Sequence, residues 1–166
     1  MKTSDGYSKT QIALHWGIVV LIAVNYIVSD GMGRAMRAML RGENVTGLTP
    51  AVHVYVGLAV LALVALRLVI RLWRGAPAPV GHGPEILEKM GEAAHWLLYL
   101  LLFAVPVLGA LAWYGGIASL GDVHVIAMNI MLAVAGVHAL AALYHHYVLR
   151  DEVLTRMLRP GGRPQS

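Results

Sequence analysis

The sequence predicts an all-α membrane protein, a four-transmembrane-helix antiparallel bundle. Three observations lead to this prediction: an excess of hydrophobic residues, a shortage of charge, and four separate apolar segments. Hydrophobic residues make up 58% of the 166 positions and charged residues 13%, whereas soluble domains are about 45–50% apolar and about 25% charged. Lipid is therefore the expected solvent for most of the molecular surface.

Each of the four apolar segments reaches the roughly 20 residues that a membrane-spanning helix needs. They cover approximately residues 10–29, 50–72, 91–114 and 123–149. The connections include an irregular loop at 73–90 and a tight turn at 115–122. Because short connections make consecutive helices antiparallel neighbours, we expect one domain over residues 1–159, followed by a flexible tail at 160–166.

Basic residues predict the orientation of this bundle. Lys2 and Lys9 precede the first segment, and four arginines follow the last one. Since loops on the cytoplasmic side carry an excess of lysine and arginine, we expect both termini in the cytoplasm. The net charge of +4 does not indicate a nucleic acid partner, because the basic residues lie at the ends of apolar segments, where membrane topology explains them.

Histidine is the conspicuous chemical resource of the chain. There are eight histidines and no cysteine, which excludes iron–sulfur clusters and covalent c-type haem attachment. Ionisable residues inside a membrane span are costly and usually functional. Six histidines lie within or at the edge of the predicted spans: His15, His53, His95, His124, His138 and His145.

Three of these histidines share one face of the last span. His124 and His138 are 14 residues apart, which returns to nearly the same face about 21 Å further along the axis. Neutral imidazole is a common axial ligand of non-covalently bound haem, so the spacing predicts two haems b at different depths. The alternatives are packing histidines, a proton relay, or a zinc or copper site, which would need imidazoles at one depth.

Depth along the bundle suggests how the histidines pair. His53 and His124 are both near the outer ends of their spans, so we expect them to form the outer pair. His15 lies near the inner side, and its partner on the last span is His138 or His145. Depth slightly favours His145, whereas a moderate distance between the two irons favours His138, and geometry alone leaves this choice open.

Other residues could support the same sites. Gly57 and Gly136 would let a flat ring approach a helix closely, although small residues also mediate ordinary helix packing in membranes. Arg67 and Arg71 could bind haem propionates or quinone carbonyls, whereas snorkelling to the headgroups is the alternative for Arg71. His145, which can exchange protons near neutral pH, and Arg67 are candidates for a quinone and proton site on the inner side.

The first outer connection is expected to form a short amphipathic helix. It contains Arg34, Arg37 and Arg41, which run against the excess of basic residues on the inner side. A positive outer surface would steer an anionic substrate such as superoxide. Binding of this helix to anionic lipid headgroups is the alternative interpretation.

Residues 7–16 (YSKTQIALHW) resemble the opening of the bacterial cytochrome b-561 family. The other segments have further positions spaced as in that family: His53, Gly57, Arg67, Arg71, His95, Pro106, Gly109, His124, His138, His145, His146 and Tyr147. The resemblance covers essentially the whole chain. It implies two haems b with four axial ligands, His15, His53, His124 and His138, and so favours His138 over His145.

The resemblance also implies a cellular location and a reaction. It implies a multi-pass protein of the bacterial inner (plasma) membrane that passes electrons between a donor at the outer, periplasmic face and ubiquinone. The protein would then be an oxidoreductase of the superoxide:quinone type, or an electron carrier served by a periplasmic redox protein. The turn at 115–122 is shorter than in the superoxide-oxidising relatives, which leaves the donor open.

Two other functions fit the same pattern of residues. The chain could be the cytochrome b anchor and relay subunit of a larger quinone-linked redox complex, which would be found with a partner protein. It could instead be a transporter or proton channel that is lined by histidines and binds no haem. Such a protein would be colourless, so the visible spectrum separates the third class from the first two.

Overall fold

The computed structural model describes residues 6–75, 77 and 85–161, and in this part of the chain every regular element is helical. The helices are α1 (Lys9–Ile27), α2 (Met32–Leu40), α3 (Leu48–Arg74), α4 (Glu85–Gly115) and α5 (Ala118–Tyr144). A π-helical turn, η1 (His145–Leu149), continues α5, and a 3-10 turn, η2 (Thr155–Met157), follows it.

Four of these helices are long and apolar enough to cross a membrane, which confirms the predicted four-helix bundle. The spanning stretches are Lys9–Ile27, Leu48–Arg74, Glu88–Gly115 and Ala118–Leu149. Their ends differ from the predicted ones at two connections. The turn predicted at 115–122 is wrong in extent, because α5 already begins at Ala118 and positive φ at Gly116 reverses the chain. Likewise α4 begins at Glu85, inside the predicted loop at 73–90, much of which lies outside the described residues.

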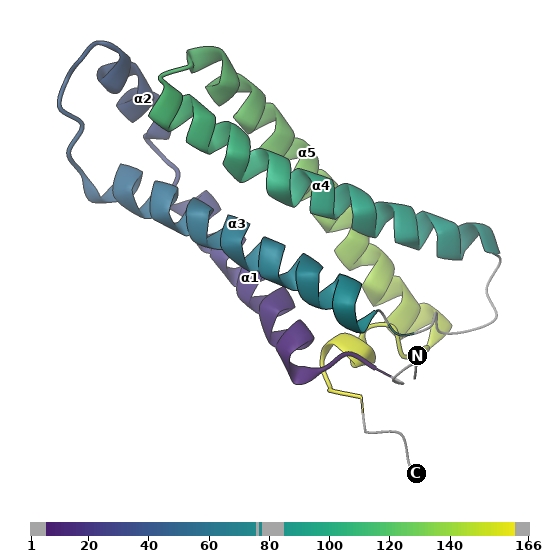
Figure 1. Cartoon of the computed structure of the whole chain (residues 1–166). Coiled ribbons are helices and arrows are strands. Elements are labelled where there is room, and N and C mark those ends of the chain that lie inside the picture. Colours follow the sequence, from purple (N-terminus) through teal and green to yellow (C-terminus); the bar gives the residue numbers. More distant parts are fainter. Residues whose placement is uncertain (1–5, 76, 78–84, 162–166) are drawn as a thin grey trace.

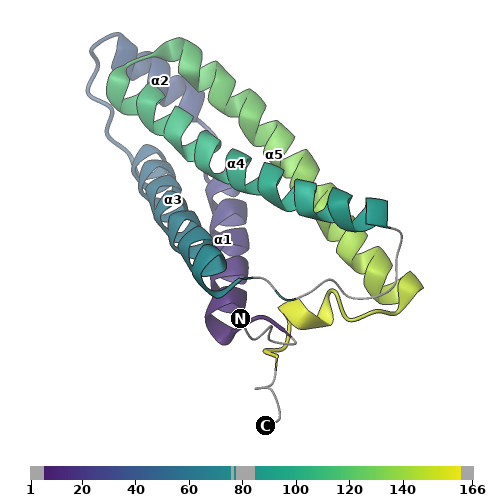
Figure 2. The ribbon, with the colours of Figure 1, turned by 45° about the vertical axis from the view of Figure 1, so that its right-hand side comes forward.

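The spanning helices form two antiparallel pairs. Helix α1 packs on α3, α4 packs on α5, and the pairs meet where α3 contacts α4. Figures 1 and 2 show the two pairs from two sides, with α2 lying at the end of the bundle near the start of α5. Helix α2 is the amphipathic helix predicted for the first outer connection, and its apolar side faces the bundle interior.

The apolar core lies midway along the bundle. One cluster of buried residues joins three of the spanning helices: Ile18, Val60, Val64 and Tyr99. A second cluster joins α4 to α5 and consists of Leu101, Val105 and Met131. On the outside, large apolar side chains are widely exposed, for example Leu100 (65%) and Val137 (67%). In a chain with spans of this length, such side chains are the lipid-facing surface.

Hydrogen bonds fasten the end of the bundle where α1 begins. Ser8 and Gln11 form a capping box that satisfies the first backbone amides of α1. The C-terminal segment folds back onto the same end: the Trp16 Nε1 donates to the carbonyl of Met157 (2.9 Å), and the Gly161 amide donates to the carbonyl of Tyr7 (3.2 Å). Both described ends of the chain therefore lie together, and most of the tail predicted at 160–166 lies outside the described residues.

Candidate cofactor sites

The bundle interior contains a cavity of about 540 Å³ at the end where α2 lies (Figure 1), which is the end predicted to be the outer one. All five α-helices contribute to its lining, which includes His53 from α3 and His124 from α5. Most of the other lining residues are apolar, among them Ile22, Val60 and Leu102. A largely apolar cavity with a few convergent polar groups, and a volume within about 300–1,000 Å³, is typical of cofactor sites.

The two histidines of this cavity face each other. Their ring centroids are 6.1 Å apart and their planes are inclined at 83°. Imidazole nitrogens bind metal ions at about 2 Å, so the spacing leaves room for one ion between the rings. The structure thus brings together the two residues that depth along the bundle had paired. Their role as axial ligands stays a prediction.

His124 is held in a defined tautomer. Its Nδ1 lies 2.8 Å from the backbone carbonyl oxygen of Val105 on α4. Since a carbonyl oxygen can only accept, Nδ1 carries the hydrogen, and Nε2 keeps the lone pair that a metal ion needs. Metal-binding histidines almost always donate their second ring nitrogen to such a partner.

Gly109 makes this hydrogen bond possible. It lies one turn after Val105, and a Cβ added to it would stand 3.0 Å from Nδ1 and 3.1 Å from Cε1 of His124. Contacts this short force the neighbouring group to move. Gly109 is one of the positions that resemble the family. The structure shows why a glycine fits there: the imidazole ring of His124 lies against the bare backbone of α4.

The opposite wall of the cavity has unpaired polar atoms. Among the described residues, neither the buried Nδ1 of His53 nor the buried Oδ1 of Asn25 has a hydrogen-bond partner. Gly57, one turn after His53, also lines the cavity, and a Cβ added to it would be 3.7 Å from Nδ2 of Asn25. Two facing imidazoles, an apolar lining and open glycine surfaces fit a flat, non-covalently bound haem.

A second group of histidines lies nearer the other end of the bundle. It combines His15 of α1, His95 of α4 and His138 of α5, and Arg67 of α3 lies close enough for its charge to act on all three. The His95 and His138 ring centroids are 5.1 Å apart. No partner of His95 was predicted from the sequence, whereas in the structure its ring contacts that of His138.

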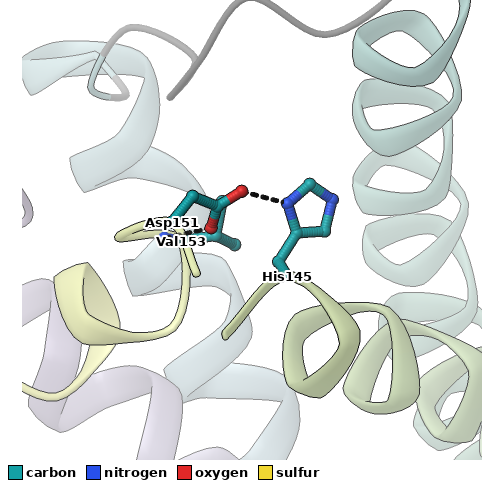
Figure 3. A network of polar contacts seen from close by, with 3 residues as sticks. All are labelled: His145, Asp151 and Val153. Atoms are coloured by element: carbon teal, nitrogen blue, oxygen red, sulfur yellow. Dashed lines mark hydrogen bonds and ion pairs between the residues drawn. The ribbon is translucent and has the colours of Figure 1, made fainter. Parts of the chain in front are cut away.

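His145 does not join this group through its ring nitrogen, but pairs with an acidic residue. Its Nδ1 lies 2.5 Å from Oδ2 of Asp151, while Oδ1 of Asp151 accepts a hydrogen bond from the Val153 amide (3.0 Å) (Figure 3). The π-helical turn and the left-handed conformation of Arg150 (φ 56°) bend the chain back to make this contact. Asp151 was not predicted as a site residue, because a continuous α-helix would not have brought it to His145.

The two arginines predicted to bind cofactor or quinone lie in the C-terminal part of α3, toward the end of the bundle predicted to be the inner one. Arg67 donates from Nη1 to the carbonyl oxygen of Gln11 (2.7 Å). The Cζ of Arg71 lies 5.9 Å from the ring centroid of Tyr99, within cation–π range. Gly136 is exposed, and a Cβ added there would meet nothing within 4 Å. The proposed cofactor contacts of Arg67, Arg71 and Gly136 stay predictions.

Residues 6–160 match the protein family described as prokaryotic cytochrome b561. The chain belongs to the prokaryotic cytochrome b561 family. Cytochrome b562 of Cereibacter sphaeroides is 42% identical over 160 residues, which are 96% of this chain and 99% of that protein. The probable superoxide oxidase CybB of Yersinia pestis is 30% identical over 173 residues, or 92% of this chain and 95% of that protein.

Membership of this family establishes the general role of the chain. A cytochrome b561 is a membrane cytochrome b that transfers electrons and carries haem b. Cytochrome b561 homolog 1 of Escherichia coli is also 30% identical, over 92% of this chain and 96% of that protein. The outer cavity and the inner histidines are therefore the candidate haem sites of a b561 protein.

Replacing the inner histidines one at a time should identify the ligand on α5. We expect His138→Ala, which removes the axial ligand implied by the family resemblance, to lower the haem content per chain, and His145→Ala to keep the wild-type content. Haem quantification per chain on purified protein measures this directly. Loss of a haem from His145→Ala but not from His138→Ala would show that the inner pair has been assigned wrongly. His95→Ala tests the ring contact: full haem content would make His95 a neighbour rather than a ligand.

Proposed function

We propose that this cytochrome b561 uses two haems b to transfer electrons between a donor at the outer, periplasmic face and ubiquinone. His53 and His124 would hold the outer haem, and His15 and His138 the inner one. Each haem, when bound, takes up and releases one electron at its iron. The observation that carries the proposal is the apolar cavity in which two imidazoles from different helices face each other 6.1 Å apart.

The residues of the outer site have separable tasks. The Val105 carbonyl orients the His124 ring, and the apolar lining excludes water from the space between the two histidines. Helix α2 covers the outer end of the cavity with Met32, Met36 and Arg37. If His53 and His124 both held the haem iron, neither histidine would leave a place for a substrate there. A donor would then act from the end of the cavity that α2 covers.

The charge of α2 favours an anionic donor. Arg41 pairs with Glu43 (2.5 Å), so Arg34 and Arg37 carry most of the positive charge of this surface. Such a surface raises the encounter rate with a small anion. Superoxide is the donor that we propose, which agrees with the name of the Yersinia pestis relative, probable superoxide oxidase. In this proposal α2 lies on the periplasmic side and both termini lie in the cytoplasm.

Electron transfer can be tested in vesicles that contain the purified protein and ubiquinone. Superoxide supplied outside should reduce ubiquinone, and the rate should fall as added salt screens the arginines. Protein with both His53→Ala and His124→Ala is the control for reaction of superoxide with quinone in solution. A rate equal to this control would contradict the proposed direction of transfer and donor.

Quinone reduction also needs protons, and His145 with Asp151 is placed to supply them. The two side chains lie at the inner end of α5, 33% and 18% exposed, so the pair has access to the aqueous side. A carboxylate that accepts from Nδ1 orients the ring, so that Nε2 of His145 is free to take up a proton and pass it on.

Asp151→Asn should therefore slow quinone reduction without removing haem. We expect about a tenfold loss, less than the 10²–10⁴-fold contribution of a positioned acid–base group, because His145 itself remains. The measurement is ubiquinone reduction per haem, and the visible spectrum checks that both haems remain. Glu152→Gln, which changes the neighbouring exposed carboxylate, is the matched control. Equal rates for both variants would remove His145 and Asp151 from the proton path.

A further inference from the structure

Two polar atoms on one wall of the outer cavity have no hydrogen-bond partner among the described residues. They are Nδ1 of His53 and Oδ1 of Asn25, and both are buried. Leaving a buried polar group unpaired costs about 1–3 kcal/mol. Two such atoms in adjacent residues of one cavity indicate a contact that forms when the cavity is filled.

The two outer histidines differ in how their second nitrogen is held. His124 has the Val105 carbonyl as its acceptor, which fixes its tautomer. In the part of the chain that the structure describes, Nδ1 of His53 has no equivalent bond, so no such bond fixes its tautomer. A metal ligand needs the hydrogen on the nitrogen that faces away from the metal, and a partner that keeps it there.

Asn25 is placed to be that partner. It lies in the last turn of α1, beside the His53 ring. Its Nδ2 is 3.7 Å from the Cβ position of Gly57, on the same face of α3 as His53 and one turn further along. The amide therefore lies along the His53–Gly57 face, with an oxygen that needs a donor.

The backbone at Asn25 strengthens this assignment. The Ser29 amide donates to the carbonyl of Tyr26 instead of the carbonyl four residues before it, which is that of Asn25. The Asn25 carbonyl is therefore a second acceptor without its usual helical donor, and it faces the His53 ring. Asn25 thus has two acceptors, Oδ1 and the backbone carbonyl oxygen, for which the described residues supply no N–H donor.

We propose that Asn25 is a positioning residue for His53: its amide oxygen accepts the Nδ1 hydrogen and so directs the Nε2 lone pair toward the iron of the outer haem. The inference rests on the proposed function, because it assumes a haem between His53 and His124. A neutral amide suits this depth, since a carboxylate in the same place would be a buried charge.

The reduction potential of the outer haem tests this role. A hydrogen bond from Nδ1 makes the ring a stronger electron donor, which favours the oxidised iron. Asn25→Leu removes the side-chain acceptor and should raise the potential, whereas Asn25→Asp strengthens the acceptor and should lower it. We expect a roughly tenfold change in the redox equilibrium for each variant, about 59 mV for a one-electron couple.

Two internal references make the measurement specific. The outer haem is the component of the redox titration that is absent from His53→Ala, and the inner haem should keep its potential in both Asn25 variants. Gly91→Ala is the control, because Gly91 is not among the lining residues of the cavity and a Cβ there would meet nothing within 4 Å. The low-spin electron paramagnetic resonance signal should move with the potential, since it reports ligand strength.

The outcomes separate this inference from the proposed function. Opposite shifts in Asn25→Leu and Asn25→Asp support the positioning role, as does loss of the outer haem from Asn25→Leu together with its retention in Asn25→Asp. Unchanged potentials, shifts of the same sign, or loss of the haem from both variants would overturn it. Wild-type protein without haem would instead refute the proposed function itself.

Discussion

His124→Ala is expected to lower the haem content from two per chain to one. The substitution removes one of the two imidazoles that face each other in the outer cavity, 6.1 Å apart, and leaves the Val105 carbonyl without its donor. A non-covalently bound haem depends on its axial ligands, so the outer site should lose its haem. The inner histidines are about 21 Å away along α5 and should keep theirs.

The measurement is haem per chain, together with a redox titration that resolves the components. His146→Ala is the matched control, since it removes an imidazole from the π-helical end of α5, away from the outer cavity. His53→Ala should lose the same component of the titration as His124→Ala. If the two variants lost different components, His53 and His124 would not share a haem.

Gly109→Val is expected to remove the outer haem almost as completely as loss of a ligand. A Cβ at this position would already stand 3.0 Å from Nδ1 of His124, and the further methyl groups of valine need still more space. The ring would have to leave the Val105 carbonyl, which fixes both its tautomer and its direction. Loss of such a partner of a metal ligand costs about 10–100-fold in metal affinity.

Gly109→Ala should give a graded form of the same effect. We expect the outer haem to remain bound but with an altered reduction potential and a shifted low-spin resonance signal. Gly91→Ala, in the same helix, is the control, because a Cβ there would meet nothing within 4 Å. Normal haem content and potential in Gly109→Val would show that the position of the His124 ring in the structure is not the one that binds haem.

The sequence predicted the fold well because lipid imposes a simple requirement on it. A helix that crosses a bilayer must be long and apolar, so the four spans are visible in composition alone, and the structure confirms them. The helix ends were less accurate. Ala118 begins α5 well before the predicted start near Val123, because residues at the outer boundary are too mixed in polarity to mark a helix end.

The depth of each histidine was also predictable, but the atoms that orient the rings were not. His53 and His124 were paired from their positions along two helices, and their rings do face each other. By contrast, the acceptor of the His124 ring is a backbone carbonyl. Every residue has one, so the sequence does not indicate which carbonyl accepts this hydrogen bond. Gly109 was the one residue that could have indicated the position of the His124 ring, since a glycine in a span can mark a place where another group lies against the backbone.

The contacts of His145 and His138 depend on how α5 ends and on how it packs against α4. Asp151 reaches His145 through a π-helical turn and a left-handed residue, and neither can be derived from hydrophobic periodicity. His95 meets His138 because α4 and α5 pack along their length. Sequence spacing places residues on the face of a helix, whereas the rotation of one helix against another decides which faces meet.

The central claim, two haems b held between facing histidines, is tested most directly on the purified wild-type protein. A dithionite-reduced minus oxidised visible spectrum, with haem quantified per chain, is the measurement. We predict two low-spin b-type haems per chain, distinguishable in a redox titration. One haem per chain would mean that one of the two histidine sites is wrong, and a folded, colourless protein would contradict the account as a whole.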